Sequence, residues 1–340
     1  MNDLLTTSLF KFHQDQNSKM IEFAGWQMPF SYDGTIKEHN YVRTASGFFD
    51  VSHMGRIYIE NEEIVNLNKL ICSDLINLDN TKALYSVFTN EEGNALDDVI
   101  FWKFDSHIIL ICNAINRGKI TKHLLNNNIT HKDVTFDTSL IAIQGPQAIE
   151  LAKQLVDIPE KFSTNHNETF TYARTGYTGE DGLEIMYENQ HTDKVIDFLY
   201  QNKIKPCGLG SRDTLRLEAS LPLYGFELSE KISPVEANLK WIITNNEEYL
   251  GKNKIEAQIA SGKHKYIKKF TLESKRIPRT GTIVKSGTIS GVVTSGNYSP
   301  ILEKSIGFAL FDSLPESDLI EFDIRGNLLE GQIIKKRFLS

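Results

Sequence analysis

The chain has 340 residues, of which 40% are hydrophobic and 24% charged, and its formal net charge is −7. A chain of this length can form two or three domains, because single cores stop growing at about 250–300 residues. The negative charge argues against a general nucleic-acid or membrane-surface binder, since both kinds of protein use a basic face.

The predicted elements in the first half of the chain alternate between strand and helix. The first fifty residues show no regular pattern. From Gly55 onward, residues 56–60 alternate like a strand, and apolar residues at helical spacing predict a helix within residues 63–72. Further strands are predicted at 99–104 and 107–112 and a helix at 118–126. These elements indicate a small α+β unit.

The second half changes character after Gly251. Before this point we predict a buried strand at 140–143 and helices at 148–157, 193–201 and 212–219, with Thr192 and Ser211 as N-caps of the last two. After it, short alternating segments such as residues 268–273 are separated by glycine turns. That pattern predicts a small all-β barrel or sandwich.

The cysteines and the chain start favour a reduced cytoplasm. The three cysteines are far apart and none forms a C-x-x-C pair, which argues against a disulfide framework and a zinc site. The first twenty residues resemble neither a signal nor a transit peptide, and apolar runs such as Ile108 to Cys112 are too short to span a bilayer. We therefore expect a cytoplasmic protein that binds neither nucleic acid nor membrane.

Most standard catalytic motifs are missing from the sequence. There is no G-x-G-x-x-G after a strand, no P-loop, no G-x-S-x-G elbow and no H-x-x-x-H spacing. Ser52 and His53 are neighbours, but adjacent positions do not build a nucleophile-base pair. We expect no catalytic metal.

Two adjacent carboxylates are the first candidate site. Asp97 and Asp98 precede the apolar residues 99–102, where a turn is predicted to become a strand. Because strand side chains alternate between faces, the two acids should point in opposite directions and not share a proton. One of them could face a pocket while the other caps the turn. The local pattern also fits two turn-capping aspartates.

Two further segments carry polar side chains in unusual settings. Glycines at 176, 179 and 182 allow a tight loop around Tyr177, and Glu184 follows between two apolar residues. Arg212 lies near a predicted helix start, where it could bind an anion or a carbonyl oxygen. The alternatives are an exposed strand glutamate and a surface helix with ordinary ion pairs. With Tyr85 and Tyr177 available for stacking, these groups suit a pterin, whose edge of N–H donors matches a carboxylate.

Ten ordered sequence blocks together carry a family resemblance. They are Phe23–Trp26, Phe49–Met54, Ala83–Ser86, Leu96–Ile100, Ile143–Pro146, Thr175–Glu180, Gly210–Ala219, Leu223–Gly225, Ser233–Glu236 and Val293–Gly296. The chain resembles the aminomethyltransferase, or T-protein, family of the glycine cleavage system over nearly its whole length. A single block of this kind would be weak, whereas ten in order are specific.

The resemblance implies a fold and a domain organisation. The expected class is α+β, a three-domain cloverleaf with a folate-binding core, a ferredoxin-like insert and a C-terminal β-barrel. The first domain would be discontinuous, with residues 1–50 and 138–250. The ferredoxin-like second domain would be residues 51–137, and the barrel residues 251–340.

The resemblance also implies a reaction and its residues. The family moves a methylene carbon from an aminomethyl group on lipoylated H-protein to tetrahydrofolate and releases ammonia; tetrahydrofolate is the acceptor substrate and no metal takes part. By motif position, the catalytic acid is Asp98. The folate-binding side chains are Glu184, Arg212, Asn113, Tyr85, Tyr177, Met54 and Leu84.

Some features depart from the family pattern, and other functions stay open. Leu221-Pro222 differs from the pair that relatives often carry, and a C-terminal tyrosine that contacts folate in some relatives has no counterpart in the short end of the chain. One alternative is a folate-dependent demethylase of a small methylated substrate. Another is a non-enzymatic folate-binding iron-sulfur assembly protein, although residues 205–210 do not match its cysteine motif.

Overall fold

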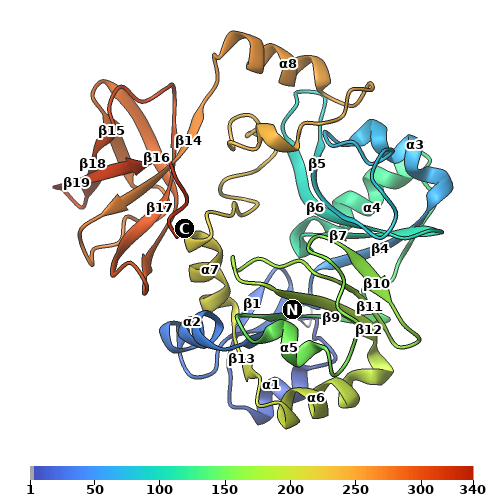
Figure 1. The fold of residues 1–340 in the computed structure, drawn as a ribbon. Coiled ribbons are helices and arrows are strands. Elements are labelled where there is room, and N and C mark those ends of the chain that lie inside the picture. The colour runs from blue at the N-terminus through green and yellow to red at the C-terminus, as the bar shows by residue number, and fades with distance from the viewer. Residues whose placement is uncertain (1–3, 340) are drawn as a thin grey trace. The chain divides into compact units, whose positions relative to one another are not determined.

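The computed structural model describes residues 4–339. Contacts between residues divide the chain into two compact units. The first comprises the residues up to Asn68 together with Asp74–Ser86 and Val99–Asp213. The second comprises Lys69–Ser73, Val87–Asp98 and the residues from Thr214 onward. Figure 1 labels most of the helices and strands of both units.

A six-stranded sheet in the first unit has the order β10-β11-β12-β9-β3-β13. Its strands are β3 (Gly47–Asp50), β9 (Thr138–Gln144), β10 (Thr164–His166), β11 (Phe170–Ala173), β12 (Gly182–Glu188) and β13 (Lys205–Pro206). Neighbours pair antiparallel except β13, which pairs parallel to β3. The expected strand at 140–143 is the middle of β9.

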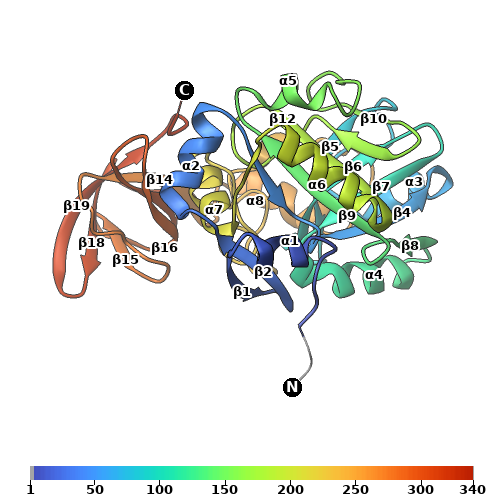
Figure 2. The same ribbon diagram turned by 90° about the horizontal axis from the view of Figure 1, so that it is seen from below.

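Three helices cover one face of this sheet, as Figures 1 and 2 show. They are α1 (Phe10–Asp15), α5 (Ala148–Ala152) and α6 (Thr192–Gln201). Leu183, Ile185 and Tyr187 of β12 belong to the same buried cluster as Phe12 of α1 and Phe198 of α6. Because strand residues alternate between faces, the side chains between these three belong to the opposite face of the sheet.

The N-terminal fifty residues contain regular structure, so the expectation of an irregular segment was wrong. They form α1, the hairpin β1 (Lys19–Phe23) and β2 (Trp26–Ser31), helix α2 (Thr35–Thr44), and β3. The hairpin turns at Ala24 and Gly25, which both have positive φ. Helix α2 buries Glu38 and His39 beside Val42, and such a helix carries no apolar stripe that periodicity could detect.

A five-stranded sheet has the order β5-β6-β7-β4-β8. Its strands are β4 (Gly55–Glu60), β5 (Ala83–Thr89), β6 (Ala95–Lys103), β7 (His107–Cys112) and β8 (His131–Asp133), and its helices are α3 (Ile64–Leu67) and α4 (Arg117–Asn126). Without β5, the chain order is β-α-β-β-α-β, which is the ferredoxin-like pattern. The strands expected at 56–60, 99–104 and 107–112 and the helix at 118–126 are confirmed.

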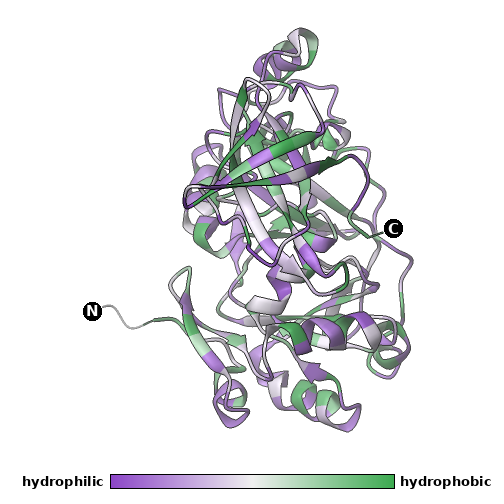
Figure 3. Ribbon diagram, turned by 90° about the vertical axis from the view of Figure 1, so that its left-hand side faces the viewer, coloured by the Kyte–Doolittle hydropathy of each residue, from purple (hydrophilic) through white to green (hydrophobic). Residues whose placement is uncertain are grey.

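The second unit contains a closed barrel with the order β14-β17-β16-β15-β18-β19. Its strands are β14 (Tyr266–Leu272), β15 (Ile283–Ser286), β16 (Ile289–Ser299), β17 (Lys304–Phe311), β18 (Leu319–Ile324) and β19 (Asn327–Ile334). Phe270, Phe311 and Phe322 lie in its core, and Figure 3 shows hydrophilic and hydrophobic residues alternating along strands. The α+β class and the C-terminal barrel are confirmed.

The remaining helices are short and several ends differ from expectation. They are α7 (Leu209–Glu218), α8 (Lys252–Ser261) and the 3₁₀ turns Asn61–Glu63, Asn68–Leu70, Ala114–Asn116, Asn189–His191 and Lys240–Ile242. The helix expected to reach residue 157 ends at Ala152. Thr192 is not the N-cap of α6, because its hydroxyl donates to the carbonyl of Asn189 inside a preceding 3₁₀ turn. Ser211 does not cap α7 either, since that helix already begins at Leu209.

Candidate active site

Glu184 lies on the sheet face opposite the helical core. It follows Leu183 and precedes Ile185, both of which are fully buried in that core, and the alternation of the strand therefore turns Glu184 the other way. Its side chain is nevertheless 5% exposed. The hydroxyl of Thr175 donates a 2.6 Å hydrogen bond to Glu184 Oε2. The alternative of an exposed strand glutamate is excluded.

Burial is the largest influence on the pKa of Glu184. Removal from water raises the pKa of its carboxyl, and the Thr175 hydroxyl and the positive charge of Arg212 act in the opposite direction. A buried carboxyl of this kind gains most from a ligand that offers N–H donors, because these favour the ionised form. Glu184 is therefore suited to a ligand that is cationic or that carries several hydrogen-bond donors.

The loop that carries Tyr177 is held by hydrogen bonds to the side chain of Gln144. The Gln144 amide nitrogen donates to the carbonyl of Thr175 at 3.1 Å, and its oxygen accepts from the Thr178 hydroxyl at 2.9 Å. Gly176 permits this approach, because a Cβ there would lie 1.9 Å from Gln144 Oε1. Arg43 of α2 holds the other side by donating to the Thr178 carbonyl at 2.8 Å and to Glu180 at 2.9 Å.

Arg212 on α7 contacts two of the expected site residues. Its guanidinium lies over the ring of Tyr177, 4.4 Å from the ring centre, which is a cation–π contact. Its Nη2 atom is 4.0 Å from Met54 Sδ. The start of α7 is anchored by the buried Glu38, whose Oε2 accepts from the Gly208 amide at 2.8 Å. Arg212 is thus held by the position of its helix and by aromatic stacking.

The turn between β3 and β4 presents His53 and Met54. His53 is 5% exposed, and its Nδ1 is buried without a hydrogen-bond partner among the described residues. Burial lowers the pKa of His53 to about 3; the charge of Asp50 opposes this shift, whereas Arg212 and Arg56 add to it. The imidazole is therefore neutral at physiological pH.

The aspartate pair lies on β6 with its members on opposite faces. The burial of β6 alternates, with Asp97 fully buried beside Ala95 and Val99, whereas Asp98 is half-buried like Leu96 and Ile100. The expectation that the two acids point in opposite directions is confirmed. Both aspartates fall in the second compact unit, whereas Glu184, Arg212, Tyr177 and Met54 fall in the first.

Three expected site residues complete the set. Leu84 and Tyr85 are half-buried near the start of β5, and Asn113 is half-buried directly after β7. Among the expected site residues, direct contacts join Arg212 to Tyr177 and to Met54, and the charge of Arg212 acts on Glu184.

Reasoning from the sequence missed Thr175, Gln144 and Arg43, which hold this cluster in place. The sequence feature that could have indicated these supporting residues is the glycine spacing of the loop, because glycines allow other groups to approach the backbone closely.

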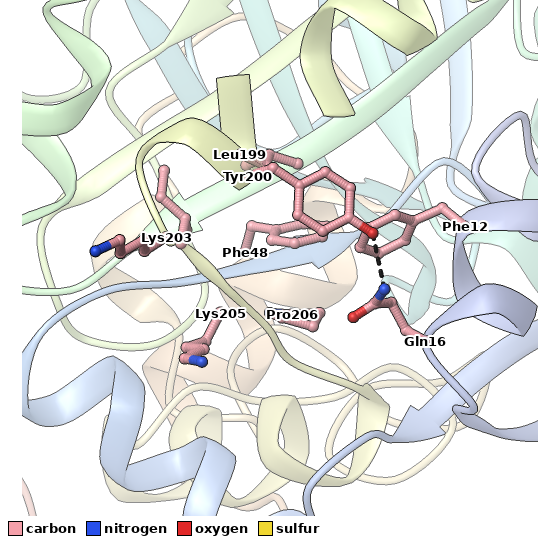
Figure 4. A pocket seen from close by; sticks show the side chains of 9 residues that line it. Phe12, Gln16, Phe48, Leu199, Tyr200, Lys203, Lys205 and Pro206 are labelled. Atoms are coloured by element: carbon pink, nitrogen blue, oxygen red, sulfur yellow. Dashed lines mark hydrogen bonds between the residues drawn. The ribbon is translucent and has the colours of Figure 1, made fainter. Parts of the chain in front are cut away.

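A separate pocket of about 210 Å³ opens in the first unit. Figure 4 shows its walls of Phe12, Phe48 and Leu199, with Lys203 and Lys205 nearby and a hydrogen bond between Gln16 and Tyr200. None of the expected site residues lines it. The expected chemistry therefore does not lie in this pocket.

Comparison with known proteins identifies the family. Residues 9–247 match the model of the GCVT N-terminal domain, and residues 265–339 match that of the glycine cleavage T-protein C-terminal barrel domain. The chain belongs to the glycine cleavage T-protein family.

Relatives in this family cover the chain from end to end. An aminomethyltransferase of Thermoanaerobacter is 37% identical over 361 aligned positions, with 99% of this chain and 98% of that protein covered. One from Staphylococcus epidermidis is also 37% identical, with 98% of each chain covered. The crystal structure of the glycine cleavage system aminomethyltransferase T from Bartonella henselae superposes with a TM-score of 0.92 at 26% identity, over 99% of this chain and 98% of that chain.

Two further observations concern metal binding and membrane-spanning helices. Within residues 4–339, no three His, Cys, Asp or Glu side chains are grouped so that they could hold a metal ion. Over the same range, every helix is too short or too polar to cross a bilayer.

Proposed function

We propose that this chain is the tetrahydrofolate-dependent aminomethyltransferase of a glycine cleavage system. It takes a methylene carbon from the aminomethyl-lipoyl group of H-protein and transfers it to tetrahydrofolate. The observation that carries the proposal is the full-length similarity to proteins named aminomethyltransferase, which span both family domains. The same similarity favours aminomethyl transfer over the demethylation of a small substrate. A cytoplasmic location fits this role.

The reaction conserves its atoms without any oxidant. The bond between the lipoyl sulfur and the methylene carbon breaks, as does the bond between that carbon and the amine nitrogen. Two new bonds join the carbon to two nitrogens of the folate, which lose one proton each. One proton ends on ammonia and the other on the lipoyl thiol. No covalent bond to the enzyme is needed.

The cluster around Glu184 fits a pterin. Its buried carboxyl has a raised pKa and is suited to N–H donors such as those on the pterin edge. Arg212 and Tyr177 supply a flat cationic and aromatic surface beside it. We assign Glu184 and Arg212 to pterin binding. We further propose that the folate cavity is lined by Met54, Leu84, Tyr85, Tyr177 and Asn113.

We assign the catalytic role to Asp98. Its carboxylate would orient the folate, favour the nucleophilic form of the attacking nitrogen and stabilise the cationic iminium-like carbon as ammonia leaves. Its half-buried position on β6, opposite the fully buried Asp97, supports this choice within the pair. We also propose three domains, residues 1–50 with 138–250, residues 51–137 and residues 251–340; the observation that supports them is that each sheet lies within one of these ranges.

The test is turnover with a defined donor. Purified enzyme, tetrahydrofolate and aminomethylated H-protein should release ammonia and form 5,10-methylenetetrahydrofolate in equal amounts. A small methylated compound offered in place of H-protein should give no product. Turnover with the small compound alone would support a demethylase instead, and folate binding without turnover of either donor would support a non-enzymatic role.

A further inference from the structure

Arg56 is fully buried where the chain crosses twice between the six-stranded sheet and the five-stranded sheet. The chain leaves the six-stranded sheet after β3 and enters the five-stranded sheet at β4, and it returns from β8 to β9. Arg56 is the second residue of β4 and is 0% exposed. It therefore lies beside both connecting segments.

The guanidinium of Arg56 ties these two segments together. Its Nη1 atom donates to the carbonyl of Ser52 at 2.9 Å and to that of Met54 at 2.5 Å. On the other side, Nη2 donates to the carbonyls of Thr135 and Thr138, and Nε donates to the Thr138 hydroxyl at 2.8 Å. All of these acceptors are neutral oxygens. The planar fork of an arginine can serve two segments at once, whereas the single ammonium of a lysine cannot reach the same set.

A second buried group holds the other end of the same turn. Asp50 accepts from the amide of Ser52 at 2.9 Å, from the Thr7 hydroxyl at 2.6 Å and lies 2.8 Å from His13 Nε2. Asp50 thus fixes the start of the turn, and Arg56 fixes its middle and end. The backbone of residues 52–54 has little freedom left, although it forms no regular structure.

This turn carries Met54 against the candidate folate site. Met54 Sδ lies 4.0 Å from Arg212 Nη2, and Arg212 in turn stacks on Tyr177. The hydrogen bonds of Arg56 all go to neutral oxygens, and the carboxylates of Asp50 and Asp133 act on it only through space, so that burial still lowers its pKa to about 10. A buried cation held in this way is a costly means of stabilising a fold, because apolar residues of similar size often stabilise as well or better. What the guanidinium adds is a fixed geometry for the carbonyls of Ser52 and Met54.

We propose that Arg56 is a positioning residue for folate binding, which it serves by holding the 52–54 turn so that Met54 faces the ligand in one arrangement. The inference rests on the proposed function, because the ligand is taken to be tetrahydrofolate. Arg56 itself contacts neither substrate. Its substitution should therefore weaken folate binding more than it slows the chemical step.

The test compares Arg56→Lys and Arg56→Gln with the wild type. Tetrahydrofolate affinity is measured by calorimetry, turnover is measured at saturating folate with aminomethylated H-protein, and thermal unfolding is followed in parallel. Both variants should bind tetrahydrofolate about tenfold more weakly. Their kcat should stay within about threefold of the wild type, since Asp98 is untouched. Arg56→Lys, which keeps the charge, guards against a glutamine variant that fails to fold.

Lys103 offers a matched control. It is a buried cation of the same unit, 6% exposed, and its ammonium donates to the carbonyls of Leu75, Ile76 and Leu78, which are not site residues. Lys103→Gln should lower the unfolding temperature as the Arg56 variants do, yet leave the Kd for tetrahydrofolate within twofold. If Lys103→Gln weakens binding as much, the effect of Arg56 is only structural and the inference fails.

A double-variant cycle checks the route of the effect. If Arg56 acts through the turn, the effects of Arg56→Lys and Met54→Ala on Kd should overlap, so that the double variant loses less affinity than the product of the two single losses implies. If the two changes in binding free energy are fully additive, Arg56 does not act through Met54. An unchanged Kd in both Arg56 variants would overturn the inference while the wild type still binds and transfers. A wild type that neither binds folate nor transfers would instead overturn the proposed function.

Discussion

At the scale of single residues, the two adjacent aspartates separate into different roles. Asp97 is fully buried, and Asp98 is half-buried on the other face of β6. Asp98→Asn should lower kcat by about 10²–10⁴-fold, because a carboxylate that assists proton movement and stabilises a cation cannot be replaced by an amide. Asp97→Asn should instead lower the unfolding temperature and leave transfer per folded molecule within about threefold. Ammonia release and thermal unfolding measure the two effects, and the reverse order would mean that Asp97 is the catalytic acid.

Glu184 predicts a pH dependence of folate binding. Burial raises its pKa in the free protein, so at acidic pH part of the population carries a neutral carboxyl. Pterin N–H donors favour the carboxylate, and the ligand must then displace a proton. The Kd for tetrahydrofolate should therefore fall as the pH rises through the pKa of Glu184, by up to about tenfold per pH unit below that pKa, and then level off.

Glu184→Gln is the control for this pH dependence. The amide cannot ionise, so the component of the pH dependence that belongs to Glu184 should disappear, while titration of the ligand itself is common to both proteins. The variant should also bind more weakly than the wild type above the pKa of Glu184, and the difference should narrow as the pH falls below it. If the Kd has the same pH dependence in the two proteins, the proposal that the Glu184 carboxylate contacts the pterin is wrong.

At the scale of elements, the loop from Thr175 to Gly182 is held by close packing. A Cβ on Gly176 would lie 1.9 Å from Gln144 Oε1, so Gly176→Ala must displace the amide that binds Thr175 and Thr178. The loss of these hydrogen bonds should reduce the free energy of unfolding by about 1–3 kcal/mol. It should also weaken folate binding, because Tyr177 belongs to the same loop.

Gly118 provides the matching glycine substitution. It lies in helix α4, and a Cβ there would meet nothing within 4 Å. Gly118→Ala should therefore stabilise the protein by about 0.4–1 kcal/mol and leave folate binding unchanged. Denaturant unfolding checks both variants. If Gly176→Ala is as stable as Gly118→Ala, the loop is not held by Gln144 in the way the contacts indicate.

The elements that follow a simple period were predictable from the sequence. Strand β7 and helix α4 are found where their apolar spacing indicates, and β6 shows the alternation that separates Asp97 from Asp98. Helix α2 was missed because its inward-facing Glu38 and His39 are polar. Arg56 was missed for a related reason: alternation along β4 groups it with polar residues, yet the crossing segments bury it completely.

At the scale of the whole chain, the site depends on contacts between residues far apart in the sequence. Arg212 meets Met54 across 158 positions, and local patterns cannot predict such a pair. Asn113, Met54 and Leu84 were available from the sequence only through the ordered motifs of a family, and the family is now shown by matches over residues 9–247 and 265–339. The supporting contacts of Gln144, Thr175 and Arg56 required the structure.

The central claim is the transfer of a methylene carbon from H-protein to tetrahydrofolate. The most direct measurement combines purified enzyme with tetrahydrofolate and H-protein whose aminomethyl carbon is isotopically labelled, and follows the label and ammonia together. The account predicts that the label appears in 5,10-methylenetetrahydrofolate, that ammonia is released in equal amount, and that Asp98→Asn slows both by about 10²–10⁴-fold. Label that stays on H-protein with the wild-type enzyme and saturating tetrahydrofolate would contradict it.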